Sequence, residues 1–147
     1  MNTTLRSTKY FWRSVVSIAA LLVFGYAGSA YSQEVRVLLA GNQEIPQVVT
    51  PASGSGEFTV GADGAVSGSV TTLSLAGTAA HIHEGAVDKN GPVVIPLTQT
   101  STNLWSVPAG ARLTPTQLAS FKAGMLYVNV HSAANKGGEI RGQLIPK

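Results

Sequence analysis

Short runs of alternating apolar and polar residues, each ended by glycine, proline or serine, constrain this fold more than any other feature of the sequence. In "EVRVLLA", Val35, Val37 and Leu39 lie two residues apart. The polar side chains of Glu34 and Arg36 fall between them. A period of two is typical of a β-strand with one buried face. Runs this short and this often interrupted predict an all-β, antiparallel, Greek-key-like β-sandwich.

Further strands are predicted along residues 33–147. "GEFTVGADGAVSGSV" reads as a hairpin around a Gly-Ala-Asp-Gly turn. The apolar pattern slips between Val70 and Leu73, which predicts a bulge. "GPVVIPL" has prolines at its ends, which favours an edge strand. The remaining predicted strands are "AAHIH", "NLWSV", "MLYVNVH" and "EIRGQLI".

One short helix is predicted within "LTPTQLASFKAG". Thr114 is placed as the N-cap, with Pro115 at the first helical position and Gln117 completing a capping box. A helix of about two turns is too short to be stable alone. We therefore expect it to dock Leu118 and Phe121 on the sheet.

The first 32 residues have the layout of a secretory signal peptide. Three basic residues precede an uncharged apolar run of 14 residues, Ser14 to Ala27, and small residues follow it. This pattern predicts cleavage between Ser32 and Gln33, a mature domain of residues 33–147, and a secreted or periplasmic location. The alternative is a retained membrane anchor, but a span needs roughly 20 apolar residues. We therefore expect no membrane span in the mature form.

Charge and cysteine content exclude several functions. The chain has ten Lys and Arg residues and seven Asp and Glu residues, and three of the basic residues lie in the first 32 positions. Residues 33–147 therefore carry no net charge, which argues against a nucleic-acid partner. The chain has no cysteine, so disulfides, thiolate metal sites and thiol nucleophiles are excluded. It also has no Gly-x-Ser-x-Gly motif of a serine hydrolase.

The three histidines of the chain are the candidate metal ligands. His81 and His83 lie two residues apart in "AAHIH", so they share one face of a strand, with Cα atoms roughly 6.5–7 Å apart. His131 ends the alternating run "YVNVH" and would supply a third ligand if that strand neighbours the first. Three imidazoles without thiolates suit Cu(II) or Zn(II). The alternative is that all three are ordinary surface or hydrogen-bonded histidines.

Several stretches resemble a known family. "VLLAGNQEIPQVVTPASGSGEFTV", "AAHIHEGAVDKNGPVVIPL" and "LYVNVHSAANKGGEIRGQL" closely resemble, in this order, the CHRD domain, which is named for the repeats of chordin and occurs in exported bacterial proteins. This resemblance covers essentially all of residues 33–147. It implies an extracytoplasmic β domain, and it implies no settled biochemical activity.

A second resemblance is to Cu/Zn superoxide dismutase. "HIHEGAVD" is similar to the paired-histidine segment of that enzyme, and "VNVHSAANKGGEIRGQLI" to its late copper histidine and final strand. This resemblance implies that His81, His83 and His131 match copper ligands. It also implies that Arg141 matches an arginine that attracts the superoxide anion. The bridging histidine, the zinc ligands and the disulfide cysteines of the enzyme have no counterpart here.

The sequence leaves three functions open. The first is an exported domain that binds copper, rather than zinc, through the three histidines. The second is a structural or interaction domain without metal, whose partner would be another exported protein. The third is a copper-only, dismutase-like enzyme in which Arg141 guides the anion. If Arg141 has no such role, we expect it to pair with an acid such as Glu139 or Glu84.

Overall fold

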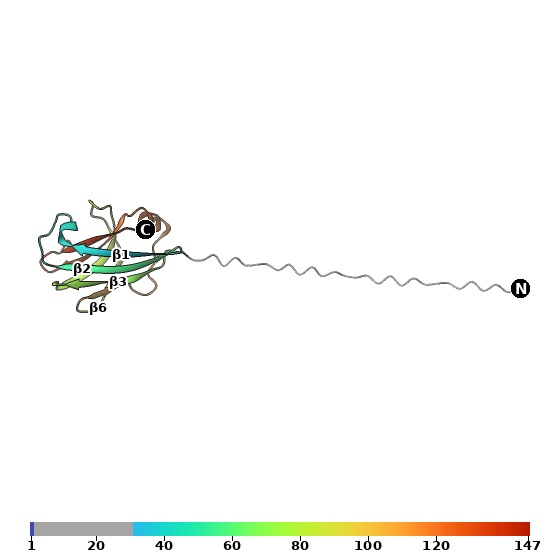
Figure 1. The fold of residues 1–147 in the computed structure, drawn as a ribbon, viewed down its shortest axis with the longest axis horizontal. Coiled ribbons are helices and arrows are strands. Elements are labelled where there is room, and N and C mark those ends of the chain that lie inside the picture. Colours follow the sequence, from blue (N-terminus) through green and yellow to red (C-terminus); the bar gives the residue numbers. More distant parts are fainter. Residues whose placement is uncertain (2–30) are drawn as a thin grey trace.

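The structure is a computed structural model that describes Met1 and residues 31–147 (Figure 1). The predicted signal peptide, residues 1–32, therefore lies almost entirely outside the described residues, and β1 begins at Ser32. The strands of the described part are β1 (Ser32–Ala40), β2 (Ser53–Gly61), β3 (Val66–Leu73), β4 (Gly77–Glu84), β5 (Val93–Pro96), β6 (Thr98–Ser101), β7 (Leu104–Ser106), β8 (Leu126–Ser132) and β9 (Ile140–Leu144). A short 3-10 helix, Gly41–Gln43, follows β1.

These strands form one antiparallel sheet that curls around a single core. Its order is β5-β4-β8-β9-β1-β2-β3-β7-β6. The hairpin of β8 and β9 therefore lies between β4 and β1, so neighbours in the sheet come from distant parts of the sequence, as in a Greek key. The two edge strands, β5 and β6, are separated in the chain by Leu97 alone, so the sheet is nearly closed. The Leu97 amide donates to the Ala80 carbonyl of β4 at 2.9 Å. The predicted all-β, sandwich-like fold is confirmed.

The inner faces of the strands hold the apolar residues that the alternation predicted. Val35, Val37 and Leu39 of β1 are buried, while Arg36 and Leu38 between them are exposed. Because successive side chains on a strand point to opposite faces, one register places every second residue of β1 in the core. The same rule places Ala80 and Ile82 of β4 and Val128 and Val130 of β8 in the core.

The predicted helix is α1 (Pro115–Lys122). The Gln117 amide donates to Thr114 Oγ1 at 3.2 Å, and the Thr114 amide donates to Gln117 Oε1 at 2.9 Å, which confirms the capping box. Phe121 is fully buried in the core, and Leu118 is partly buried against it. No helix in the described part of the chain has the length and apolar character that crossing a bilayer requires.

Two local predictions were wrong. β3 has no bulge, because its register with β2 runs without interruption from Val66 to Leu73. Thr72 is 1% exposed and Leu73 is 63% exposed, the reverse of what their polarity suggests. The hydroxyl of Thr72 faces the carbonyl oxygen of Asn103 at 3.4 Å, and this partner allows a threonine to be buried. β6 was also missed, since all four of its residues are exposed and show no apolar alternation.

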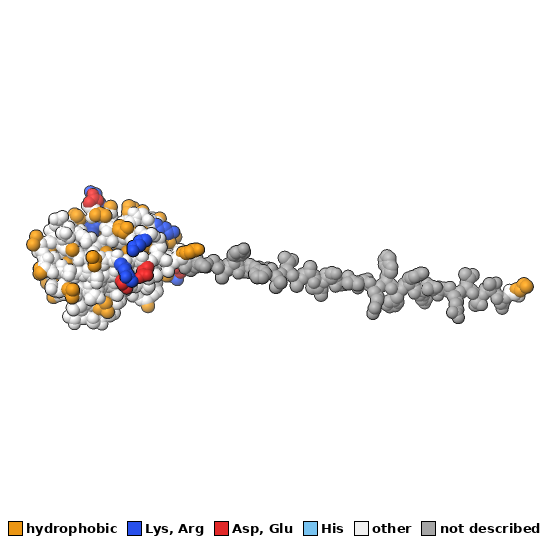
Figure 2. Space-filling view, viewed as in Figure 1, with side chains coloured by type: hydrophobic (Ala, Val, Ile, Leu, Met, Phe, Trp, Pro, Cys, Tyr) orange, Lys and Arg blue, Asp and Glu red, His pale blue; other side chains and the backbone are white. Residues whose placement is uncertain are grey.

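The two outer faces of the sheet differ in what lies over them. We call the outer surface of β4, β8 and β9 the covered face, because the loops 85–92 and 133–139 bond to its side chains and the loop 41–52 lies beside Arg141 and Gln143. We call the outer surface of β1, β2 and β3 the open face, where residues such as Leu38, Ser55 and Thr71 are exposed. Figure 2, in the orientation that shows β1 to β3 in Figure 1, presents a mostly uncharged surface with a few scattered charged groups.

Candidate metal centre

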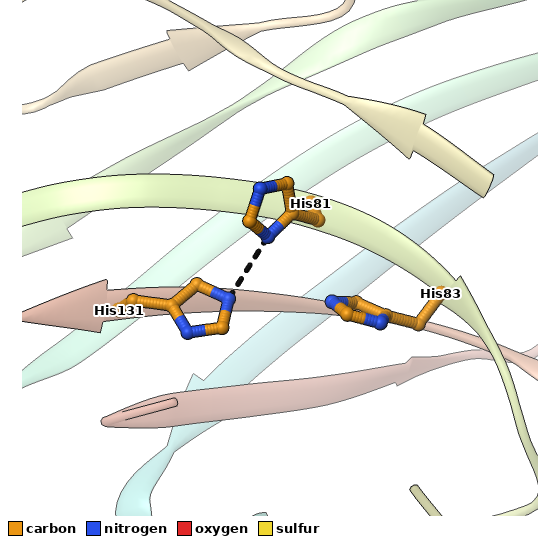
Figure 3. A group of neighbouring side chains, drawn as sticks. All are labelled: His81, His83 and His131. Atoms are coloured by element: carbon orange, nitrogen blue, oxygen red, sulfur yellow. Dashed lines mark hydrogen bonds between the residues drawn. The ribbon is translucent and has the colours of Figure 1, made fainter. Parts of the chain in front are cut away.

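The three histidines meet on the covered face. His81 and His83 point outward from β4 because the residues beside them, Ala80 and Ile82, point into the core. β8 pairs with β4 so that Ala79 lies opposite His131, two pairs away from His81 and on the same face of the sheet. This register brings the third histidine to the other two, as the sequence predicted. In Figure 3 the ring nitrogens of the three side chains turn toward a common point.

The distances between the imidazoles are short enough for one ion. One ligand nitrogen from each histidine lies within 4.8 Å of the other two. His81 Nδ1 and His131 Nε2 are 2.9 Å apart, the distance of a hydrogen bond. Two nitrogens that bind one ion at about 2.0–2.1 Å each need a separation close to this. The cluster therefore needs only small side-chain movements to coordinate a single metal.

Backbone carbonyls set the tautomers of two of the histidines. His83 Nδ1 lies 3.0 Å from the Gly91 carbonyl oxygen, and His131 Nδ1 lies 2.9 Å from that of Lys136. A carbonyl oxygen only accepts, so both Nδ1 atoms carry the proton and donate it. Each Nε2 is then left with a free lone pair. Metal-binding histidines are oriented by such bonds in the same way.

The Nδ1 atom of His81 forms a hydrogen bond with another histidine, whereas those of His83 and His131 bond to backbone carbonyls. His81 Nδ1 faces the lone pair on His131 Nε2, so this Nδ1 carries the shared proton in the metal-free protein. Coordination through this Nδ1 would require that proton to move to Nε2 of His81, since a neutral imidazole that binds a metal through one nitrogen carries its proton on the other. The ligand atoms would then be Nδ1 of His81 and Nε2 of both His83 and His131.

Burial keeps the ligands in their neutral form. The pKa of His81 is lowered first by burial and then by the charges of His131 and His83. The pKa of His83 is also lowered chiefly by burial, although its bond to Gly91 acts in the opposite direction. A neutral imidazole is the form that binds a metal. Both residues are therefore ready to bind an ion at neutral pH.

Arg141 lies behind Tyr127 rather than beside the histidines. The guanidinium carbon is 3.5 Å from the centre of the Tyr127 ring, and the His83 ring stacks on Tyr127 at 4.9 Å with an interplanar angle of 4°. Both groups stack on one ring, so they must lie on its opposite faces. The order of the stack is therefore His83, Tyr127 and Arg141.

Arg141 is also held by the surrounding loops. Only 1% of the residue is exposed. Its Nη2 donates to the Ala86 carbonyl at 2.7 Å and to Gln143 Oε1 at 3.2 Å, and its Nη1 donates to Asn90 Oδ1 at 3.2 Å. These contacts fasten the loop 85–92 over the covered face. The role in guiding an anion stays a prediction, and the geometry shows a structural role.

The alternative partners predicted for Arg141 were wrong. Glu84 accepts a hydrogen bond from Ser120 Oγ at 2.6 Å, and Glu139 accepts one from Thr50 Oγ1 at 2.6 Å. Both acids are therefore engaged elsewhere. The physical reason is the loop 85–92, which supplies carbonyl and amide oxygens directly over the guanidinium.

Four residues that shape this centre were not predicted from the sequence. The Tyr127 hydroxyl accepts a hydrogen bond from the Gly91 amide at 3.2 Å, so tyrosine and His83 hold the same peptide segment. Asn129 and Glu44 are buried beside them. Tyr127 and Asn129 alternate with His131 in "YVNVH", and this spacing was the one available signal for them. Nothing local to Glu44 or Gly91 indicates their positions.

The fold and this cluster define an all-β domain with three converging histidines. The family model of the CHRD domain matches residues 35–144. The match covers most of the chain, which therefore belongs to the CHRD domain family. No curated protein and no solved structure matches the chain. The similarity to Cu/Zn superoxide dismutase is thus not supported by these comparisons.

Proposed function

We propose that this CHRD domain is exported and binds one copper ion through His81, His83 and His131. The observation that carries the proposal is the convergence of three histidine nitrogens within 4.8 Å of one another. Two of the rings are already oriented by backbone carbonyls, and burial disfavours protonation of two. A binding role in storage, delivery or tolerance requires no further chemistry from the chain.

The ligand chemistry favours copper over zinc. Imidazole binds both ions, but a site of given nitrogen ligands binds Cu(II) more tightly than Zn(II) in the usual order of divalent metals. The chain has no cysteine, so thiolate ligands, which are typical of structural zinc sites, are absent. We therefore expect a stronger complex with Cu(II).

Calorimetric titration of the purified protein with Cu(II) and with Zn(II) tests this proposal. We expect one Cu(II) ion per chain and weaker binding of Zn(II). Ion binding to the folded state alone should also raise the melting temperature in proportion to the logarithm of the free copper concentration. Absence of binding by both metals would overturn the proposal.

Export is tested separately by the intact mass of the protein recovered outside the cytoplasm. We expect a chain that begins at Gln33. β1 loses only its first pair, Ser32 with Gly61, when residues 1–32 are removed, so the domain should stay folded. A mass that includes residues 1–32 would contradict export by signal-peptide cleavage and favour a retained anchor.

A second candidate is a structural or interaction domain without metal. The observation in its favour is that the Nδ1 atoms of His83 and His131 already donate to backbone carbonyls. In that case the histidines stabilise loops 85–92 and 133–139. Copper should then leave the melting temperature of the wild type unchanged, while His83→Ala should lower it without added metal. The two candidates are separated by whether copper alters stability.

A further inference from the structure

Asn129 occupies the centre of the histidine cluster. It lies opposite His81 in the pairing of β8 with β4, and it shares the outer face of β8 with Tyr127 and His131. On its other side it lies opposite Arg141 of β9. The residue is only 2% exposed. Its side chain is therefore enclosed by the same groups that surround the proposed ion.

The orientation of the Asn129 amide is fixed by oxygen atoms at its nitrogen end. Nδ2 donates to the Gly137 carbonyl oxygen at 3.4 Å. A side chain at Gly138 would collide with both Glu44 Oε1 and Asn129 Nδ2, so both atoms lie directly beneath this glycine. With acceptors around Nδ2, the oxygen Oδ1 must face away from the loop 133–139.

The Oδ1 atom of Asn129 is buried and has no hydrogen-bond partner, and the same is true of His83 Nε2. The two side chains are close neighbours, because Asn129 lies opposite His81 and Tyr127, its neighbour on the same face of β8, lies opposite His83. His83 Nε2 carries a lone pair, since its Nδ1 donates to Gly91. Two buried lone pairs therefore lie side by side without a donor. A cation between them would satisfy both.

We propose that Asn129 Oδ1 is a fourth ligand of the ion, which gives a centre of three nitrogens and one oxygen. This inference rests on the proposed function, and it names the form of the metal. An amide oxygen is a hard ligand that suits a divalent ion, whereas Cu(I) prefers soft sulfur ligands. The site therefore selects Cu(II) over Cu(I). The neutral amide adds no charge to the complex.

The affinities of the Asn129→Leu variant for Cu(II) and for Cu(I) test the proposal. We expect Cu(II) affinity to fall about tenfold or more, while Cu(I) affinity, measured under reducing conditions with a competing chelator, changes much less. The matched control is Asn103→Leu, which removes an exposed amide from the turn between β6 and β7, outside the covered face. The control should keep the wild-type ratio of the two affinities.

Electron paramagnetic resonance of the Cu(II) protein gives a second, independent readout. Replacing an oxygen ligand changes the copper hyperfine coupling. Replacing a residue that does not bind the copper leaves this coupling unchanged. We expect a changed spectrum in both Asn129→Leu and Asn129→Asp, with tighter Cu(II) binding in the latter because a carboxylate is a charged oxygen ligand. Should Asn129→Leu fail to fold, Asn129→Asp decides the question.

Three outcomes would overturn the proposal. The first is an unchanged spectrum and affinity in the Asn129 variants. The second is an equal loss of Cu(I) and Cu(II) affinity, which indicates a general effect on the site. The third is a change of the same size in Asn103→Leu. Failure of the wild type to bind copper at all would instead reject the proposed function, so the two failures are distinguishable.

Discussion

The covered face and the open face of the sheet both carry polar side chains in alternation with the core, yet only the covered face buries them. On the open face, Arg36 and Glu57 pair at 3.2 Å with both side chains mostly exposed. On the covered face, His83, Asn129 and Arg141 are buried under loops. Burying polar groups costs free energy unless partners are supplied. The covered face supplies them for Arg141 and leaves lone pairs on His83 and Asn129, which points to a ligand there.

Removal of one copper ligand should give the largest difference in Cu(II) affinity between a substitution on the covered face and one on the open face. His83→Ala should lower Cu(II) affinity at least about 100-fold, since loss of a direct ligand should exceed the 10–100-fold effect of outer-shell partners. The matched change on the open face, Thr71→Ala, should leave the affinity unaltered. Competition titration against a chelator of known strength measures both. Equal affinities in the two variants would show that copper binds elsewhere.

Removal of an arginine from each face should change stability unequally. Arg141→Met deletes the bonds to Ala86 and Asn90 and the contact with Tyr127, so we expect the free energy of unfolding to fall by about 3 kcal/mol. Arg36→Met deletes exposed ion pairs and should cost about 0–1 kcal/mol. Urea unfolding without metal measures both values. Similar losses would mean that the loops contribute little to the covered face.

Substitution of the buried acid Glu44 should change the pH dependence of the unfolding free energy more than substitution of the exposed acid Glu57. Burial raises the pKa of Glu44 from 4.5 to about 7, against the opposing effect of Arg141. The folded state then keeps a proton that the unfolded chain releases, so stability falls as the pH rises from 4.5 to about 7. Glu44→Gln removes this loss.

The measurement is the difference in unfolding free energy between Glu44→Gln and wild type at pH 4.5 and at pH 8. We expect Glu44→Gln to be more stable than wild type by about 2 kcal/mol at the higher pH and similar to it at the lower pH. Glu57→Gln should differ from wild type by less than about 1 kcal/mol at both. A Glu44→Gln variant that gains nothing at pH 8 would contradict the buried carboxyl.

The smallest effect should come from the histidines in acid, without metal. The pKa values of His81 and His83 are lowered in the folded state, so the unfolded chain binds protons that the folded state does not. Stability should therefore decrease as the pH falls below the unfolded value of 6.5. Glu44→Gln is the background for this measurement, because Glu44 acts in the opposite direction over the same pH range. Added Cu(II) should steepen this decrease in stability. A stability that does not change with pH would contradict the burial of His81 and His83.

Local features of this protein could be predicted from the sequence because they depend on neighbours in the chain. The alternation of Val35, Val37 and Leu39 places them on one face of a strand, whatever the strand pairs with. Thr114 and Gln117 cap the helix through bonds across three residues. The shared face of His81 and His83 follows from the same period of two.

Only the tertiary structure decided which distant residues meet. His131 reaches the pair because β8, not another strand, lies beside β4 in a register that a shift of one residue would destroy. Glu44, Gly91 and Asn90 join the centre from loops, where no periodicity constrains position. Burial of Thr72 likewise depends on the carbonyl of Asn103, 31 residues away. Strand order, register and loop placement result from the packing of the whole chain, so no local pattern specifies them.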